Sequence, residues 1–338
     1  MRFFENYLLT DRNTFHIHAR ARFYAEPASE AELRGLLHSV TARNLPLMVL
    51  GGGSNIVFSG DYPGLVLRPA LRGVRCYAED AGFYYVEAGG GEPWHPFVQY
   101  CLSQHWYGLE NLSLIPGTVG AAPIQNIGAY GVELTDVLHS LTAMDIQTGQ
   151  LRDFSHAECR FGYRESVFKQ ELKGRYIIIR VCFRLRKKPA VKTAYGDITR
   201  ELEAMQIAGE PTPRQLADAV IAIRRRKLPD PDVLGNAGSF FKNPVVPTAH
   251  YDALKTTFPE LVAYPQQDGV KLAAGWLIEQ AGWKGRRIGP VAAYEKQALV
   301  LVNYGGATGE NVMALAAAVQ QTVQEKFGVR LEIEPLVY

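Results

Sequence analysis

The chain lacks the features that mark several large classes of protein. Its 338 residues include only four cysteines, which lie far apart and form no Cys-x-x-Cys pair, so neither a zinc knuckle nor a disulfide framework is indicated. The eight histidines show no His-x-x-x-His spacing, and we expect no metal site. Residues 1–14 contain no apolar signal segment, and no apolar run approaches the roughly 18 residues of a membrane span. We therefore expect a cytoplasmic protein that is neither secreted by a standard signal nor inserted in a membrane.

An excess of charge of one sign is also absent. The chain has 36 Lys and Arg residues against 34 Asp and Glu residues, a formal net charge of +2, which excludes a polybasic binder of nucleic acid or of acidic membranes. Hydrophobic residues make up 47% of the chain and charged residues 21%, as in globular proteins that bury a core. At roughly 100–200 residues per domain, the length favours two domains.

Local patterns predict the first helices and strands. Ser29 followed by Glu32 has the spacing of a capping box, and the apolar stripe after it predicts a helix. Short apolar runs at 47–50, 56–58 and 64–67 are separated by turn residues and predict strands. The N-terminal part is therefore expected to have a βαβ-like start.

Further along, an alternating pattern predicts a strand from residue 175 to residue 186. Thr212 and Gln215 then form a second capping box, with Pro213 at the first helical position, and we place a domain boundary before this helix. A helix at 310–327 precedes the end of the chain. The residues expected on one face of the 175–186 strand are Ile177, Ile179, Val181, Phe183 and Leu185.

A glycine turn, residues 51–55, joins two of the short strands. Three glycines let backbone N–H groups converge on a phosphate, although glycine clusters also mark ordinary tight turns. The dinucleotide fingerprint does not fit, because its third glycine would fall at Ile56. The chain contains no Gly-Lys dipeptide, so a P-loop is excluded.

A second stretch rich in Gly, Ala and Pro, residues 115–131, is a poor helix and a poor core segment. Its composition favours a backbone surface pressed against a large flat ligand. The alternative is a long surface loop.

Three shorter motifs place reactive side chains. Arg160 and Arg164 offer guanidinium forks for a carboxylate or phosphate, although a surface helix is the alternative. Ser239 lies on a glycine-flanked turn. Three roles stay open for its hydroxyl, namely proton donor, nucleophile and helix cap. The basic run 224–227 complements a helix dipole and could also bind a diphosphate. A strand predicted at 329–333 points both of the last carboxylates, Glu332 and Glu334, to one face, as on a charged sheet edge.

Taken together, these motifs resemble those of one family. They are similar, in the same order and over nearly the whole chain, to segments of the UDP-N-acetylenolpyruvoylglucosamine reductases, which are bacterial flavoenzymes of peptidoglycan synthesis. The matching segments are residues 51–55, 115–131, 160–164, 227–231 and 235–244.

The resemblance implies an α+β fold. A non-Rossmann FAD-binding domain of the vanillyl-alcohol-oxidase type (PCMH-like), made of two subdomains, would precede an α+β substrate-binding domain. On this basis residues 1–68 and 69–210 are the two FAD-binding subdomains, residues 211–328 are the substrate-binding domain, and residues 329–338 are a C-terminal strand with a catalytic glutamate.

The resemblance also implies roles for individual residues. Arg164, Ser239 and Glu332 match the family's catalytic trio, but the closing strand departs from the usual Leu-Glu-Pro-Glu-Val, so the choice between Glu332 and Glu334 stays open. The insert between Asn243 and Asp268 is similar to the type I branch, in which a tyrosine loop closes over the substrate. Positions that match substrate contacts are Tyr195, Lys227, Asn243 and Tyr264. Positions that match FAD contacts are Gly51, Gly52, Gly53, Ser54, Asn55, Ile115, Pro116, Gly117, Thr118, Gly120, Ala121, Ala122, Gln125, Asn126, Gly128, Tyr130 and Gly131.

The implied reaction is the NADPH-dependent reduction of UDP-N-acetylglucosamine enolpyruvate to UDP-N-acetylmuramate. Tightly bound FAD would pass on a hydride, Arg164 would hold the substrate carboxylate, Glu332 would steady the enol form, and Ser239 would deliver a proton. The expected partners are two small molecules, the substrate and NADPH, with no nucleic acid and no membrane, and we expect a monomer. Two alternatives are an FAD-linked alcohol oxidase of the same fold and a nucleotide-sugar-binding regulatory protein without catalysis.

Overall fold

The computed structural model describes residues 2–39, 44–266 and 268–338, which form two compact units. No helix in these ranges is long and apolar enough to cross a membrane. Each unit combines segments that are distant in the sequence. Unit 1 consists of Met1–Tyr7, Ala21–Gly52 and Pro63–Arg226, and unit 2 consists of Leu8–Arg20, Gly53–Tyr62 and Lys227–Tyr338.

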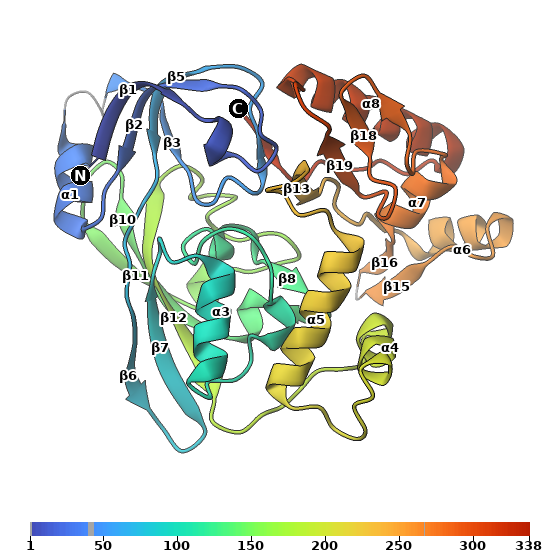
Figure 1. The fold of residues 1–338 in the computed structure, drawn as a ribbon, viewed down its shortest axis with the longest axis horizontal. Coiled ribbons are helices and arrows are strands. Elements are labelled where there is room, and N and C mark those ends of the chain that lie inside the picture. The colour runs from blue at the N-terminus through green and yellow to red at the C-terminus, as the bar shows by residue number, and fades with distance from the viewer. Residues whose placement is uncertain (1, 40–43, 267) are drawn as a thin grey trace. The chain divides into compact units, whose positions relative to one another are not determined.

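The first sheet of unit 1 has four strands in the order β1-β2-β5-β3, with β3 parallel to β5 (Figure 1). Helix α1 (Glu30–His38) follows β2 and precedes β3, as the predicted βαβ-like start requires. It begins at Ser29, whose hydroxyl accepts the N–H of Glu32 at 3.2 Å. The Glu32 carboxylate accepts the N–H of Ala28 at 2.8 Å, one residue earlier than a capping box requires. The strands are β1 (Arg2–Leu8), β2 (Arg20–Glu26), β3 (Leu47–Val49) and β5 (Tyr62–Leu67).

The second sheet of unit 1 has five antiparallel strands in the order β11-β10-β12-β7-β6 (Figure 1). Helix α3 (Trp94–Ser103) packs on one face of it. The rings of Trp94 and Phe97 lie with their centroids 6.0 and 4.9 Å from that of Phe183. All three side chains belong to the larger hydrophobic core of the unit. The strands are β6 (Val74–Glu79), β7 (Phe83–Gly89), β10 (Leu138–Asp145), β11 (Leu151–Ser155) and β12 (Tyr176–Arg186).

Strand β12 confirms the predicted strand but buries both of its faces over part of its length. Its register with β10 shifts at Ile179, so a β-bulge turns the apolar side chains from one face to the other. The prediction of a single apolar face was wrong, because an extra residue in a ladder leaves no mark in the sequence pattern. Ile177 and Ile179 pack with residues of α1 and the first sheet, whereas Val181, Phe183 and Leu185 pack with α3.

Helices α4 (Gly196–Ala204) and α5 (Pro213–Lys227) share a small core within unit 1. Helix α5 begins at the predicted capping box, because the N–H of Gln215 donates to the Thr212 hydroxyl at 3.2 Å and the N–H of Thr212 donates to Gln215 Oε1 at 2.9 Å. The domain predicted for residues 211–328 therefore begins with a helix that packs in unit 1.

Unit 2 contains a four-stranded sheet in the order β13-β19-β18-β17 and a long helix, α8 (Gly309–Phe327), which confirms the predicted helix at 310–327 (Figure 1). Thr308 begins α8, since its hydroxyl accepts the N–H of Asn311 at 3.3 Å. A smaller sheet has the order β14-β16-β15, and β4 pairs in parallel with β20. The elements are β4 (Ile56–Val57), β13 (Gly235–Ser239), β14 (Val245–Val246), α6 (Thr248–Thr257), β15 (Ala263–Gln266), β16 (Gly269–Leu272), α7 (Ala274–Gln280), β17 (Arg287–Ile288), β18 (Val291–Ala293), β19 (Val300–Asn303) and β20 (Leu336–Val337).

The strand predicted at 329–333 does not form. Only Ile333 makes an isolated β-bridge, with Phe241, and the C-terminal strand expected over 329–338 is confined to β20. Pro335 has no N–H and interrupts the pairing between these two points. The expected alternation of burial is nevertheless present between buried Leu331 and exposed Glu332.

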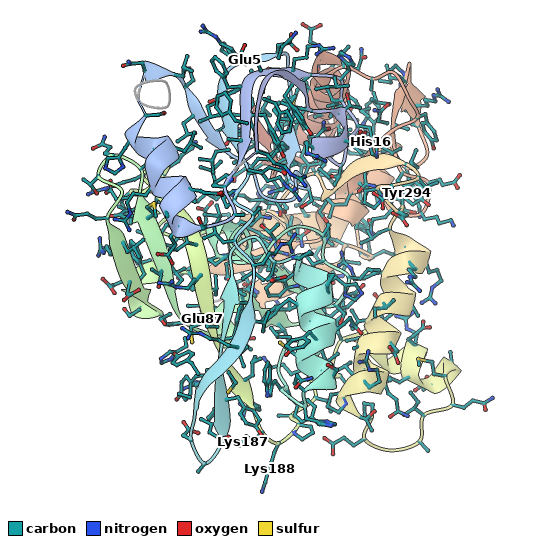
Figure 2. All side chains as sticks on the ribbon, turned by 60° about the vertical axis from the view of Figure 1, so that its left-hand side comes forward. Glu5, His16, Glu87, Lys187, Lys188 and Tyr294 are labelled. Carbon is teal, nitrogen blue, oxygen red and sulfur yellow. The ribbon has the colours of Figure 1, made fainter. Side chains whose placement is uncertain are left out.

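Short elements complete the chain, and ion pairs join strand β6 to its neighbours. Figure 2 labels Glu87 of β7 and Lys187, which follows β12. Glu87 pairs with Arg75 of β6 at 2.9 Å, and Lys187 pairs with Glu79 of β6 at 2.8 Å. Exposed pairs of this kind contribute at most about 1 kcal/mol each, so the apolar cores dominate stability. The short elements are η1 (Thr10–Arg12), η2 (Glu110–Leu112), η3 (Ala122–Gln125), η4 (Leu134–Asp136), η5 (Ala157–Cys159), β8 (Gly128–Ala129) and β9 (Val132–Glu133).

One carboxyl group is buried in unit 1 next to the core. Glu110 is 4% exposed, and its two oxygens share the N–H of Gly108 at 3.0 and 2.9 Å. Burial raises the pKa of Glu110 above its usual 4.5, because the charged form loses its hydration. The folded protein therefore binds this proton more tightly than the unfolded chain does.

We predict that Glu110→Gln removes a component of the pH dependence of stability. Since the folded-state pKa is raised, the free energy of unfolding of the wild type falls as the pH rises from about 4.5 through the raised value. The advantage of Glu110→Gln over the wild type should therefore be greater at neutral pH than at about pH 4. Urea unfolding of both proteins at the two pH values measures this, and an unchanged difference would contradict it.

Candidate active site

Two turns rich in glycine pack against each other in unit 1. A Cβ added at Gly52 would lie 2.6 Å from Gly117 Cα, and one added at Gly51 would lie 2.8 Å from Ala121 Cβ. Real Cβ atoms do not approach so closely, so both positions require glycine. The two stretches predicted to bind FAD are thus in direct contact at these residues.

The same turns carry backbone donors that the protein does not use. The N–H groups of Gly51, Gly52, Gly117 and Thr118 donate no hydrogen bond to any residue that the structure describes. Backbone N–H groups without partners suit an anion, because phosphate oxygens can accept from several of them. The residues present therefore fit the diphosphate of FAD.

The glycine turn continues into unit 2, where Gly53 has a different task. Its φ is +67°, and an added Cβ would lie 2.0 Å from the carbonyl oxygen of Arg12. The carbonyl oxygen of Gly53 accepts the N–H of Thr14 at 3.0 Å. Position 53 therefore requires glycine, because the segment 8–20 lies directly against its backbone.

The 115–131 stretch forms no α-helix, as expected, and contains the 3-10 helix η3 and strand β8, which pairs with β9 directly after the stretch. Thr118 and Ala122 are buried, which does not fit the alternative of a long surface loop. The ring of Tyr130 lies edge-on to that of Tyr195, with centroids 5.6 Å apart. A position predicted to bind substrate thus lies beside one predicted to bind FAD.

Arg164 reaches this stretch from a tight turn and not from a surface helix. Gly162 and Glu165 form a β-bridge across the turn, and Arg164 has φ +56°. Its guanidinium donates to the carbonyl oxygen of Gly128 at 2.8 Å and to that of Asn126 at 3.4 Å. Arg160 does not share the task, since it pairs with the exposed Glu171 at 2.7 Å.

Arg224 of α5 was not among the predicted site residues, although its basic run 224–227 was a signal for it. Its Nε donates to the carbonyl oxygen of Leu114 at 3.2 Å. Burial lowers the pKa of Arg224, and the neighbouring charge of Arg164 adds to this effect. Two cations therefore lie near the 115–131 stretch, where an anionic group would be stabilised.

Ser239 is the last residue of β13 in unit 2. The ladder between β13 and β19 shifts register between Asn236 and Ser239, and Gly238 within this shift has φ +68°. The Ser239 hydroxyl is exposed and forms no hydrogen bond within the described ranges. Ser239 does not cap a helix, and its proton is available to a bound ligand.

The C-terminal segment runs beside the residues that follow Ser239. The N–H of Lys242 donates to the carbonyl oxygen of Glu332, and the N–H of Glu334 donates to that of Phe240, both at 2.9 Å. Lys242 Nζ also lies 3.3 Å from Glu332 Oε2. These backbone hydrogen bonds place both candidate glutamates close to the Ser239 turn.

The remaining predicted substrate positions in unit 2 lie on two elements and in one loop. Lys227 ends α5, and Tyr264 lies on β15 with 40% of its surface exposed. Asn243 lies in the loop before β14, and its Oδ1 accepts the N–H of Ala274, the first residue of α7, at 2.9 Å. The predicted tyrosine insert contains β14, α6 and β15, while residue 267 lies outside the described residues.

We predict that Gly52→Ala lowers the FAD content of the purified protein. The new Cβ would meet Gly117 Cα at 2.6 Å, so the two turns would have to separate, at a cost of about 1–3 kcal/mol in unfolding free energy. Flavin absorbance per protein and urea unfolding measure the two effects. Gly35→Ala is the matched control, because its Cβ would meet no atom within 4 Å, and it should keep both properties. Full FAD content in Gly52→Ala would contradict the prediction.

Comparison with known proteins places the chain in a family. Residues 230–338 match the model described as UDP-N-acetylenolpyruvoylglucosamine reductase, C-terminal domain, and residues 21–155 match the model described as FAD binding domain. These matches confirm the predicted fold class, a non-Rossmann FAD-binding domain followed by a substrate-binding domain.

Relatives and a solved structure agree with this placement. The UDP-N-acetylenolpyruvoylglucosamine reductase of Burkholderia vietnamiensis is 56% identical over 330 residues, which are 97% of this chain and 95% of that protein. The one of Paraburkholderia xenovorans is 55% identical over 336 residues, 99% of this chain and 97% of that protein. The crystal structure of UDP-N-acetylenolpyruvylglucosamine reductase from Thermus caldophilus is 26% identical, with a TM-score of 0.70 over 100% of this chain and 99% of that one. The chain therefore belongs to the UDP-N-acetylenolpyruvoylglucosamine reductase family.

Proposed function

We propose that this chain reduces UDP-N-acetylglucosamine enolpyruvate to UDP-N-acetylmuramate, a step of peptidoglycan precursor synthesis. The single observation that carries the proposal is the 56% identity to reductases of that name over 97% of the chain. The protein is an FAD-dependent oxidoreductase, and NADPH is its co-substrate. We further propose that it works in the cytoplasm as a monomer.

FAD, when bound, would supply the hydride chemistry, since no side chain can donate hydride. The N–H groups of Gly51, Gly52, Gly117 and Thr118, which have no acceptor among the described residues, would hold its diphosphate. The protein's own residues must then bind the substrate carboxylate, stabilise the charge that develops on it and deliver one proton.

Arg164 is our candidate for the carboxylate. A guanidinium offers a planar fork of donors that matches a carboxylate, and two of its N–H groups already donate to the carbonyl oxygens of Gly128 and Asn126. These bonds fix its orientation before the substrate binds. A donor held in advance where negative charge develops typically contributes about 3–4 kcal/mol to catalysis.

Ser239 is our candidate for the proton donor. Its hydroxyl is exposed and has no partner within the described part of the chain, and the bulge next to it fixes the turn that presents it. A hydroxyl is a weak acid, so it gives its proton only to a strongly basic carbon, which is what hydride addition to an enolpyruvyl group creates. A positioned donor is generally worth roughly 10²- to 10⁴-fold in rate.

A glutamate of the C-terminal segment would steady the enol form, and two residues compete for this role. Glu332 matches the family position by motif, but its carboxylate pairs with Lys242 and is 69% exposed. Glu334 is less exposed, and its N–H bonds to Phe240, directly after Ser239. These contacts support Glu334 as the stronger of the two candidates.

The other substrate positions stay proposals of the same kind. The residues that would contact the nucleotide sugar are Tyr195, Lys227, Asn243 and Tyr264. The amide nitrogen of Asn243 is one candidate donor, because among the described residues only the amide oxygen forms a hydrogen bond, with the N–H of Ala274. Family membership favours this reading over an alcohol oxidase or a non-catalytic regulator.

We predict that the purified protein is yellow, is bleached by NADPH and regains its colour when the enolpyruvyl substrate is added. In Ser239→Ala the bleaching should proceed at a nearly normal rate, whereas the return of colour should be roughly 10²- to 10⁴-fold slower. Rapid-mixing absorbance measures the two half-reactions separately. Colourless wild-type protein, or wild type that fails to reoxidise with substrate, would refute the proposed activity, and an unaffected second half-reaction in the variant would remove Ser239 from the chemistry.

We predict that Glu334→Gln slows the same second half-reaction by about 10²-fold or more and that Glu332→Gln changes it by only a few-fold. Glutamine keeps the size of the side chain and removes its charge, so each variant serves as the control for the other. The opposite ranking would return the role to Glu332.

A further inference from the structure

Asn126 is a buried residue at the end of η3, with 0% of its surface exposed and φ +45°. Its amide nitrogen donates to Glu133 Oε2 at 2.8 Å and to the carbonyl oxygen of Gly162 at 3.0 Å. Its amide oxygen accepts the N–H of Thr135 at 3.0 Å. Both N–H bonds of the amide are thus used inside unit 1, and none is left for a ligand.

The side-chain amide and the backbone carbonyl of Asn126 both form hydrogen bonds with the turn that carries Arg164. The side chain holds Gly162, which forms the β-bridge with Glu165 across that turn. The backbone carbonyl of Asn126 accepts one N–H of the Arg164 guanidinium at 3.4 Å, and Gly128, two residues later, accepts another at 2.8 Å. One residue therefore links the backbone of the turn to the carbonyl groups that orient the guanidinium.

The amide also engages a carboxylate that would otherwise compete for Arg164. Glu133 and Arg164 both lie close to Gly128, since a Cβ added there would be 2.9 Å from Glu133 Cγ and 3.0 Å from Arg164 Nη1. Within the described residues Glu133 forms no ion pair with Arg164, because its carboxylate accepts from Asn126 and from the N–H of Asp136. An ion pair with Glu133 would draw the guanidinium away from the carbonyl groups of Asn126 and Gly128 that orient it.

The residue type follows from these contacts. Asparagine adopts the left-handed backbone more readily than most residues, which suits φ +45°. Only an amide offers two donors and one acceptor in this plane, whereas aspartate has no proton to give to Glu133 or to Gly162. The site therefore requires asparagine for its side-chain bonds as well as for its backbone.

We propose that Asn126 is a positioning residue that holds the Arg164 guanidinium for an external carboxylate and keeps Glu133 from pairing with it. This inference rests on the proposed function, in which Arg164 binds the carboxylate of the substrate. It differs from the role implied by resemblance, in which Asn126 contacts FAD.

The test compares two ligands of the oxidised holoenzyme by calorimetry: UDP-N-acetylmuramate, which carries the carboxylate, and UDP-N-acetylglucosamine, which does not. In Asn126→Asp the affinity for the first should fall about tenfold, as for the loss of a hydrogen bond to a charged group, while the affinity for the second stays unchanged. Adding Glu133→Gln should restore most of the loss, because the glutamine amide donates to the new carboxylate and no longer competes for Arg164.

Asn13→Asp is the matched control in unit 2. Asn13 is also buried, donates to the carbonyl oxygens of Leu9, Thr10 and Ile17, and accepts one N–H. The Asn13→Asp variant should lose unfolding free energy to a similar degree as Asn126→Asp, and its affinities for both ligands should stay unchanged. If Asn126→Asp does not fold, Asn126→Gly, which accepts the left-handed backbone, carries the same expectation for the two ligands.

Unchanged affinity for both ligands, or an equal loss for both, would overturn the inference, since the first excludes positioning and the second indicates a merely structural role. The proposed function fails on different evidence, namely wild-type enzyme that does not reduce the enolpyruvyl substrate.

Discussion

The close approach of two backbones in unit 1 is the constraint on which the proposed cofactor site depends. Gly51 and Gly52 contact Gly117 and Ala121 at distances that leave no space for a side chain. Because the turns meet through their backbones, several of their N–H groups have no acceptor among the residues that the structure describes. In the proposed function, the diphosphate of FAD would compensate for the cost of these unpaired donors.

The same stretch also orients the guanidinium of Arg164, our candidate for binding the substrate carboxylate. Carbonyl groups of Asn126 and Gly128 accept from the Arg164 guanidinium, while the amide of Asn126 holds the turn that carries it. The backbone that would bind FAD therefore also fixes the group that would bind the substrate carboxylate. One backbone segment would thus hold FAD and the substrate in a fixed orientation relative to each other.

In unit 2 the proposed proton donor, Ser239, lies next to a local irregularity of strand β13. A register shift places Ser239 at the end of β13 with its hydroxyl exposed, and the C-terminal segment pairs with the residues that follow it. With regular pairing, the Ser239 side chain would point to the side of the sheet set by the alternation of side chains along β13. Irregular strands are common next to active sites for this reason, because they redirect one side chain without altering the sheet.

The sequence by itself determined the features that depend on neighbours in the chain: the starts of α1, α5 and α8, the strands β3, β4, β5 and β12, and the ordered motifs that placed the chain in its family. Caps and apolar periodicity are local, so the residues that encode them are adjacent. Only the tertiary structure decided the bulge that divides β12 between two cores, the missing strand at 329–333, the position of Arg224 and the internal use of the Asn126 amide. Each of these depends on a partner far along the chain, and the pattern around one residue carries no information about which distant group meets it.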